Sequence, residues 1–206
     1  MFETIINLLY PNVCGFCNTI NKEGLCKKCE LKLKKYEINN VYGDVISVFK
    51  YEDIIRKKII EYKFGGKSYL YKTFAKSILN NKKIYSIFEK YDIIIPVPVH
   101  KKRRAGRGYD QSELVAKEIA KVISITLESN VLIKAKNTDV QSLLTRKQRK
   151  ENIKDAFEVR YKERIQGKKI VLLDDVYTTG ATINECKKIL KESGAIQVLV
   201  ITIAKD

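Results

Sequence analysis

No run of about 18 apolar residues occurs in this sequence, so we expect none of its segments to span a membrane. The first residues, MFETIINLLYP, are apolar but acidic rather than basic, and they lack a small-residue cleavage site, which argues against a signal peptide. Internal repeats and low-complexity segments are missing as well. With 206 residues, the chain can form one well-buried domain and a small additional module.

Acidic residues are scarce: 24 Asp and Glu stand against 40 Lys and Arg, which gives a formal net charge of +16. A cationic surface favours polyanions, of which nucleic acid is the usual one. The abundance of Lys, Ile, Asn and Tyr could instead reflect an A+T-rich genome, in which case the lysines need not form a binding surface. The only histidine, His100, has no evident carboxylate to orient it, and we do not expect it to be catalytic.

Cysteine is also infrequent, but four of the five cysteines follow the pattern C-x2-C-x8-C-x2-C, at Cys14, Cys17, Cys26 and Cys29. Each pair can turn both sulfurs toward one ion, and two pairs complete a tetrahedral Zn²⁺ site that is structural because no position stays open. Two disulfides are disfavoured because no export signal precedes them, and a redox motif because the βαβ context is missing. The fifth, Cys186, is expected to be an ordinary core thiol.

Hydrophobic periodicity after residue 40 predicts an alternation of strands and helices. Strands are expected at 45–51, 93–99, 131–135, 170–173 and 198–203, and helices at 52–62, 69–79, 112–123 and 183–193. This alternation predicts an α/β fold with a doubly wound parallel sheet and ligands at the carboxyl ends of the strands. We therefore expect two units, a zinc-ribbon-like module over residues 1–40 and an α/β domain over residues 41–206.

A segment that could be mistaken for a nucleotide-binding P-loop is Gly66-Lys67-Ser68. That pattern requires a glycine at position 61, where this chain has Glu61, and the preceding residues have helical rather than strand character. An ATPase P-loop is therefore excluded.

The most informative segment is VLLDDVYTTGAT, at residues 171–182. Asp174 and Asp175 follow a run of branched apolar residues, and a Thr/Gly loop leads into a helix. Unpaired N–H groups and the helix dipole make a helix N-terminus an anion site, and Gly180 lets the backbone approach a phosphate. The two carboxylates can hold ribose hydroxyls or a hydrated Mg²⁺. The competing interpretation is a buried strand, an acidic turn and an ordinary N-capped helix.

In this order of features the segment resembles the 5-phosphoribosyl-1-pyrophosphate (PRPP) motif of type I phosphoribosyltransferases. The resemblance implies that Asp174 and Asp175 form the catalytic pair that holds the ribose, with Mg²⁺ accompanying PRPP. It also implies that the loop holds the 5-phosphate, a role that falls to Thr178, Thr179, Gly180, Ala181 and Thr182.

A second informative segment, at residues 94–113, leads from a predicted strand through a PVP turn into a basic stretch. It resembles the pyrophosphate loop of glutamine-PRPP amidotransferases, although the chain lacks their N-terminal glutaminase domain. We expect a flexible loop that binds the departing pyrophosphate, whose charge grows as the glycosidic bond breaks. The alternative is a solvated surface loop. The candidate ligands are Lys101, Lys102, Arg103, Arg104 and Arg107.

A third segment, at residues 141–157, is polar and basic and lies between two predicted strands. It resembles the flexible lid that covers PRPP in this fold, and Arg146 and Arg149 could contact phosphates bidentately. A lid excludes water and so guards an oxocarbenium-like centre against hydrolysis. Taken alone, such a charge run is more typical of a solvated helix.

The order of all these motifs resembles the ComF family of competence-associated proteins. The shared motifs are the four-cysteine module, Y-K-x-G-G-K, PVP-x-H-x(6)-R-G-x-x-Q, Q-x(4)-R-x-x-R-x-x-N and DDVYTTGAT. The resemblance implies a cytoplasmic protein of DNA uptake that works beside a helicase-like partner. Two functions stay open: an active phosphoribosyltransferase with an unidentified acceptor, or a non-catalytic adaptor that binds single-stranded DNA or a protein partner.

Overall fold

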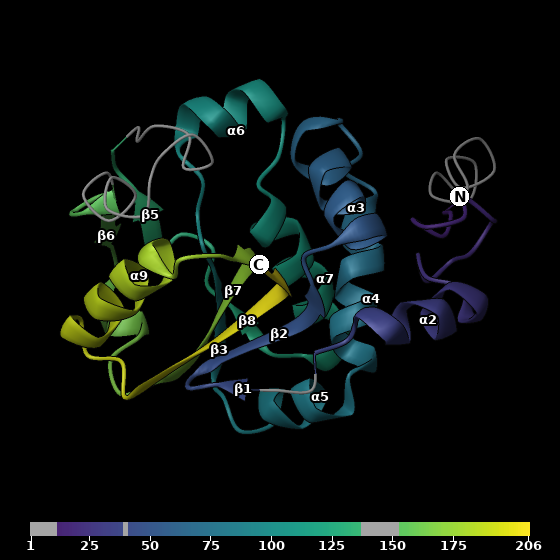
Figure 1. Ribbon diagram of the computed structural model, residues 1–206. Coiled ribbons are helices and arrows are strands. Elements are labelled where there is room, and N and C mark those ends of the chain that lie inside the picture. The colour runs from purple at the N-terminus through teal and green to yellow at the C-terminus, as the bar shows by residue number, and fades with distance from the viewer. Residues whose placement is uncertain (1–11, 39–40, 137–152) are drawn as a thin grey trace, which may run out of the picture.

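The computed structural model describes residues 12–38, 41–136 and 153–206, which form a central sheet with helices on both faces (Figure 1). Six strands make up the sheet, and all neighbours are parallel except the first pair, which is antiparallel. The parallel α/β architecture predicted from the sequence is therefore confirmed. In spatial order the strands are β1 (Val41–Tyr42), β2 (Val45–Lys50), β8 (Gln197–Lys205), β7 (Lys169–Tyr177), β3 (Ile93–Pro96) and β4 (Thr126–Leu127).

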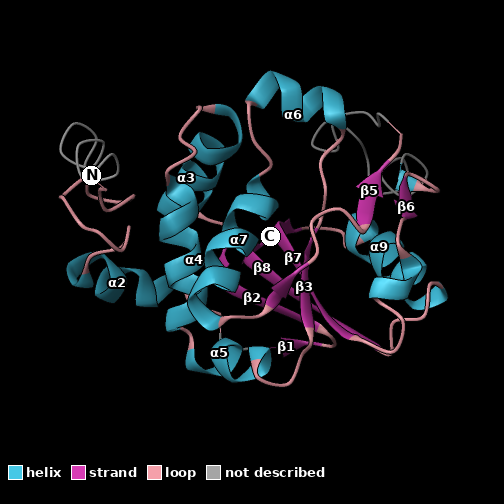
Figure 2. Ribbon diagram, turned by 180° about the vertical axis from the view of Figure 1, so that it is seen from behind, coloured by secondary structure: helices cyan, strands magenta, loops and turns pink. Residues whose placement is uncertain are grey.

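Side chains of each central strand alternate between two hydrophobic clusters, one on each face of the sheet. On β7, Val171 and Leu173 join one cluster, whereas Ile170 and Leu172 join the other. The first cluster is covered by α3 (Asp53–Phe64), α4 (Leu70–Asn80), α5 (Lys82–Phe88) and α7 (Gln111–Ile123). The second is covered by α9 (Ala181–Glu192) and a two-stranded ribbon, and Figure 2 shows the two groups on opposite sides of the strands.

The cysteine-containing segment packs against the helical side of the molecule through α2 (Lys27–Leu33) and the 3-10 helix η1 (Lys34–Tyr36) (Figure 1). Leu33 and Tyr36 are buried in the same cluster as residues of α4. Thr73 on α4 donates a hydrogen bond to the Gly24 carbonyl at 2.7 Å. A Cβ atom at Gly15 would overlap the side chains of Thr73 and Leu70, so only glycine permits this close approach.

Two local predictions were wrong. The segment 131–135 was expected in the main sheet, but β5 (Leu132–Lys134) pairs antiparallel with β6 (Phe157–Val159) in a separate ribbon, because β4 already occupies that edge beside β3. The basic stretch was expected to be a loop, but it forms α6 (Lys101–Arg107). Its first turn is capped by His100 Nδ1, which accepts a hydrogen bond from the Lys102 amide, and Gly108 ends it with a φ of +84°.

The buried Asp110 joins the two ends of residues 100–109, the segment that contains α6. One of its carboxylate oxygens accepts a hydrogen bond from the Val99 amide at 2.9 Å, and the other accepts from the Glu113 amide at 3.1 Å. Asp110 therefore caps α7 and also joins the two ends of the α6 segment.

The fifth cysteine, Cys186, is fully buried on α9, as a core thiol should be. The lid residues Arg146 and Arg149 lie outside the described residues. Among the helices that the structure describes, none combines the length and the apolar character that a membrane crossing requires.

Candidate functional site

A cleft of about 420 Å³ opens at the carboxyl edge of the sheet, beside the end of β7 and the start of α9. Both aspartates belong to β7, which continues to Tyr177 and is longer than the sequence predicted. The cleft brings together residues from α3, α6, α7, β5 and β7 and from the Thr/Gly loop that leads into α9. Its lining includes Lys63, Phe64, Arg103, Arg107, Gln111, Ser112, Lys134, Asp174, Asp175, Thr178, Gly180, Ala181 and Thr182.

The two carboxylates have different surroundings. Asp174 accepts hydrogen bonds from the Ser112 hydroxyl at 3.2 Å and from the Asp175 amide at 2.9 Å. Burial, together with the negative charge of Asp175, raises the pKa of Asp174 to about 7. Asp175 forms an ion pair with Lys63, whose ammonium nitrogen lies 2.8 Å from Oδ1. The acidic pair is thus held by one cation and two hydrogen-bond donors of the chain itself.

The Thr/Gly loop ends in a sharp turn at the N-terminus of α9. Gly180 has a φ of +76°, and a Cβ atom there would lie 2.6 Å from the Tyr177 hydroxyl. Glycine is therefore required by the turn itself, in addition to any approach of a ligand. Thr179 Oγ1 is buried and has no hydrogen-bond partner among the described residues, which is unusual for a buried hydroxyl. The loop therefore contains an unused donor beside a helix N-terminus, the arrangement that binds phosphate.

The predicted pyrophosphate ligands do not all face this cleft. Arg103 and Arg107 line it, whereas Lys101 and Arg104 line a second cleft of about 560 Å³ on another side of α6. Arg104 also pairs with Glu113 at 3.0 Å. Of the five predicted cations, Lys102 lines neither cleft. Only two of the five are therefore placed to contact a ligand beside the aspartates.

Several lining residues were not foreseen. Lys63 and Phe64 come from the last turn of α3, within the Y-K-x-G-G-K motif, so the motif was the signal that could have identified them. The guanidinium of Arg107 lies 5.4 Å from the centre of the Phe64 ring. Lys134 comes from β5, and burial, with the nearby charge of Arg103, lowers its pKa to about 8. In a chain this rich in lysine, nothing in the sequence distinguishes Lys134.

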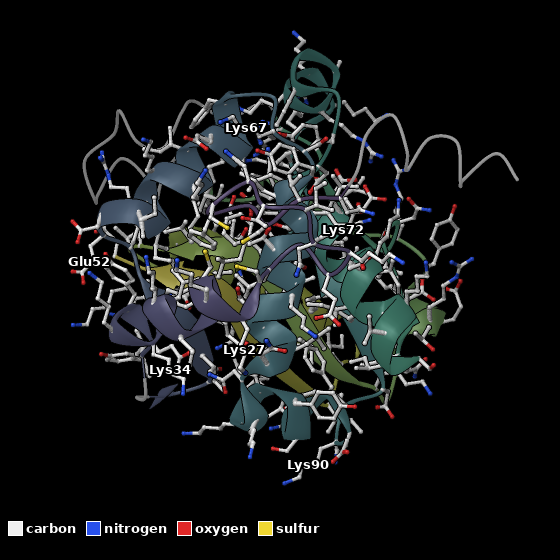
Figure 3. All side chains as sticks on the ribbon, turned by 90° about the vertical axis from the view of Figure 1, so that its right-hand side faces the viewer. Lys27, Lys34, Glu52, Lys67, Lys72 and Lys90 are labelled. Atoms are coloured by element: carbon white, nitrogen blue, oxygen red, sulfur yellow. The ribbon has the colours of Figure 1, made fainter. Side chains whose placement is uncertain are left out.

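The four cysteines form a second candidate site, remote from the cleft. Their sulfur atoms all lie within 4.8 Å of one another, and Cys17 and Cys26 are 3.7 Å apart. A tetrahedral zinc site with Zn–S bonds of about 2.3 Å requires sulfurs about 3.8 Å apart, so the cluster fits this ion. The hydroxyl of Thr19 lowers the pKa of Cys17 to about 6, which favours the thiolate that metals bind. Figure 3 shows the sulfur atoms (yellow) gathered beside α2, where Lys27 is labelled.

Comparisons with known proteins agree with this geometry. Residues 110–206 match the family of phosphoribosyl transferase domains. Competence protein F of Haemophilus influenzae is 26% identical over 212 residues, which cover 90% of this chain and 92% of that protein. Competence protein ComFC of Bacillus subtilis is 24% identical over 185 residues, or 89% of this chain and 73% of that protein. The DNA utilization protein YhgH of Escherichia coli K12 is 34% identical over 109 residues, 53% of this chain and 47% of that protein.

Among solved structures, glutamine PRPP amidotransferase from B. subtilis aligns with 64% of this chain and 25% of that chain, at 22% identity and a TM-score of 0.43. The family match over residues 110–206 and the parallel sheet indicate that the described part of the chain contains a phosphoribosyltransferase-type α/β domain. With the four-cysteine cluster and the relatives named above, the resemblance to the ComF family of competence proteins that the motifs predicted is confirmed.

Proposed function

We propose that the cleft at the end of β7 is a PRPP site of the phosphoribosyltransferase type, in a protein that serves DNA uptake. The observation that carries the proposal is the meeting of three groups in one cleft of about 420 Å³: two carboxylates, a helix N-terminus and two arginines. A sugar that bears a phosphate at one end and a pyrophosphate at the other requires this set of contacts. The competence and DNA-utilization names of the relatives support the cellular role.

Each group has a definite task in this proposal. The amides at the start of α9 and the Thr179 hydroxyl hold the 5-phosphate, because the N-terminus of the helix is positive and the hydroxyl has no partner among the described residues. Asp174 and Asp175 hold the ribose hydroxyls, and Arg103 and Arg107 face the pyrophosphate. A bound Mg²⁺ would neutralise charge on the pyrophosphate as it leaves. The acceptor that attacks the ribose is not identified by these residues.

A thermal-shift titration with PRPP and MgCl₂ tests the site. A ligand that binds only the folded protein stabilises it by about 2.7 kcal/mol at one hundred times its dissociation constant, or about 5–10 °C for a chain of this size. Asp174→Ala/Asp175→Ala should abolish the shift. The matched control, Glu89→Ala/Glu192→Ala, removes two exposed carboxylates and should keep it. If the wild-type protein shows no shift at millimolar PRPP, the proposal fails.

A second candidate function is a non-catalytic adaptor that binds single-stranded DNA or a helicase-like protein partner in the cytoplasm. The observation that favours it is α6, which presents a row of Lys and Arg side chains and contains no buried residue. In this case DNA should bind with a slope of log K against log salt near −3 for about four phosphate contacts. PRPP should compete if both ligands use Arg103 and Arg107.

Two sets of substitutions locate the DNA. Arg103→Ala/Arg104→Ala/Arg107→Ala should flatten the salt slope if α6 is the contact surface, since each lost phosphate contact removes about 0.7 from it. Lys27→Ala/Lys28→Ala/Lys34→Ala tests the cysteine module, where Figure 3 shows Lys27 and Lys34 on the outer side of the molecule. A wild-type slope near zero would contradict direct DNA binding and leave DNA uptake to a protein partner.

A further inference from the structure

The ion pair between Lys63 and Asp175 belongs to the lining of the cleft. The distance from Lys63 Nζ to Asp175 Oδ1 is 2.8 Å, and the two side chains are 23% and 12% exposed. Lys63 is the next-to-last residue of α3, a helix whose final turn ends at Gly65, where the amide bonds to the Glu61 carbonyl. The helix therefore delivers one ammonium group to the carboxyl edge of the sheet.

The electrostatics of the acidic pair depend on this lysine. Lys63 contacts Asp175 directly, and Arg107, which also lines the cleft, adds an electrostatic attraction to the same carboxylate. Burial opposes the charge of Lys63, but the attraction of the two carboxylates is larger and raises the lysine pKa above its usual value. Lys63 is therefore a permanent positive charge within contact distance of an acidic pair that would otherwise attract another cation.

The position of the ammonium group is also the position that a metal would take. Divalent ions such as Mg²⁺ and Mn²⁺ bind carboxylate oxygens directly, and an ammonium group that already contacts one of these oxygens repels them. Lys63 already contacts one oxygen of Asp175, and Asp174 already accepts two hydrogen bonds through Oδ1. A cation attached to the chain competes at a high effective concentration, which a dissolved ion must exceed.

We propose that Lys63 is the resident cation of the Asp174–Asp175 pair: it keeps divalent metal off these carboxylates and takes over the charge neutralisation that a metal would provide there. The positioning role holds for the ligand-free protein and does not depend on PRPP. Combined with the proposed function, it means that a ribose phosphate can enter the cleft without meeting two uncompensated negative charges.

A competing explanation is that the ion pair only fastens α3 to β7. A structural role predicts that loss of the lysine lowers stability and leaves metal affinity unchanged, because exposed and partly exposed ion pairs contribute little beyond local order. The proposal predicts a gain of metal affinity, which a structural role would not produce.

The direct test uses the zinc-loaded, full-length protein and Mn²⁺ as the probe, with binding followed by electron paramagnetic resonance or calorimetry. Lys63→Met should bind Mn²⁺ at least about tenfold more tightly than the wild type, because one attached cation no longer competes for Asp175. Adding Asp175→Asn should remove the gain. The matched control is Lys67→Met: Lys67 pairs with Glu61 at 3.1 Å, outside the cleft, and its loss should leave Mn²⁺ affinity at the wild-type value.

Lys63→Gln serves as a second variant if Lys63→Met does not fold. Equal Mn²⁺ affinity of either folded variant and the wild type, within about twofold, overturns the proposal.

A second experiment, a thermal-shift titration with PRPP, tests the role of Lys63 separately from the proposed PRPP site. PRPP should stabilise the wild type in EDTA as well as in MgCl₂, whereas Lys63→Met should respond only in MgCl₂, where the metal replaces the missing charge. An equal response of both proteins in EDTA counts against the role of Lys63. If PRPP has no effect on the wild type in either buffer while Lys63→Met gains Mn²⁺, the PRPP site is wrong and the resident cation stands.

Discussion

The cysteine cluster and the cleft are both groups of chemically reactive side chains, but they differ in what the chain supplies. The cluster has a complete set of ligands, with four sulfurs within 4.8 Å, and its surroundings join the main core through Leu33 and Tyr36. At the cleft, two buried donors have no partner in the described part of the chain: Nε2 of Gln111, which lines the cleft, and Oγ1 of Thr179 in the adjoining Thr/Gly loop. A site completed by its own residues and one ion stabilises the fold, whereas a site with unused donors is suited to a ligand.

Removing the metal from the cluster should have the largest effect. Structural zinc contributes about 10 kcal/mol or more to small modules, so Cys29→Ser should unfold the segment around α2, which contains a buried Cys29. Hydrogen exchange should show loss of protection at residues 12–38, weaker loss on α4, which shares their core, and none on α9. If metal analysis finds no zinc and mass spectrometry finds two disulfides, the cluster is not a metal site, and its contrast with the ligand-binding cleft is lost.

A smaller effect is expected from the turn of the Thr/Gly loop. Gly180→Ala places a side chain at positive φ, which costs about 1–2 kcal/mol, and also brings it against the Tyr177 ring. Gly167 has a similar φ of +72° and nothing within 4 Å of a Cβ atom, so Gly167→Ala isolates the backbone strain. In chemical denaturation Gly180→Ala should lose more stability, and it should also lose the PRPP shift. Equal losses in stability would mean that the Tyr177 contact is unimportant.

The last effect, which is the smallest when it is expressed per pH unit, concerns the protonation of Asp174. Its pKa of about 7 lies above the value near 3.9 of an unfolded aspartate, so between these values the folded protein binds more protons. The free energy of unfolding should therefore fall as pH rises from about 4 to about 7, by at most about 1.4 kcal/mol per pH unit from this group. Asp174→Asn should remove that part of the slope in urea denaturation, and Glu192→Gln should keep it.

The outcome at Asp174 also bears on the comparison between the two sites. A raised pKa is the signature of a carboxylate whose charge is incompletely stabilised without a ligand. Should Asp174→Asn leave the pH dependence unchanged, the carboxylate would be as well stabilised in the free protein as an ordinary surface group, and the cleft would lose part of its distinction from the cluster.

The sequence predicted the sheet well where the signal was local. Runs of branched apolar residues marked β7 and β8, and their alternation with amphipathic helices was enough to give a parallel α/β fold. The aspartates and the Thr/Gly loop were found because they are contiguous in the chain. The cysteine spacing predicted a cluster that the structure brings together.

Predictions from the sequence failed where the structure depends on contacts between residues that the sequence alone does not reveal. The apolar pattern of β5 does not reveal that β4 takes its place at the sheet edge. Gly106 and five charges suggested a loop where α6 forms. The cap that His100 provides for this helix depends on side-chain geometry, which the sequence does not reveal. Lys63 and Lys134 come from elements far from β7 in the sequence, and only the folded chain places them beside the aspartates.

The two hydrogen bonds of Asp110 make the position of the ends of the α6 segment independent of the sequence of α6. Because one carboxylate bonds to Val99 at the entrance and caps α7 at the exit, the ends of the segment are fixed without help from α6 itself. Loops whose ends are held in this way tolerate changes of length and sequence at small entropic cost. We therefore expect that residues 100–109 can be replaced by homologous segments of other lengths between Val99 and Asp110. The anion preference of the protein could then change while its sheet stays intact.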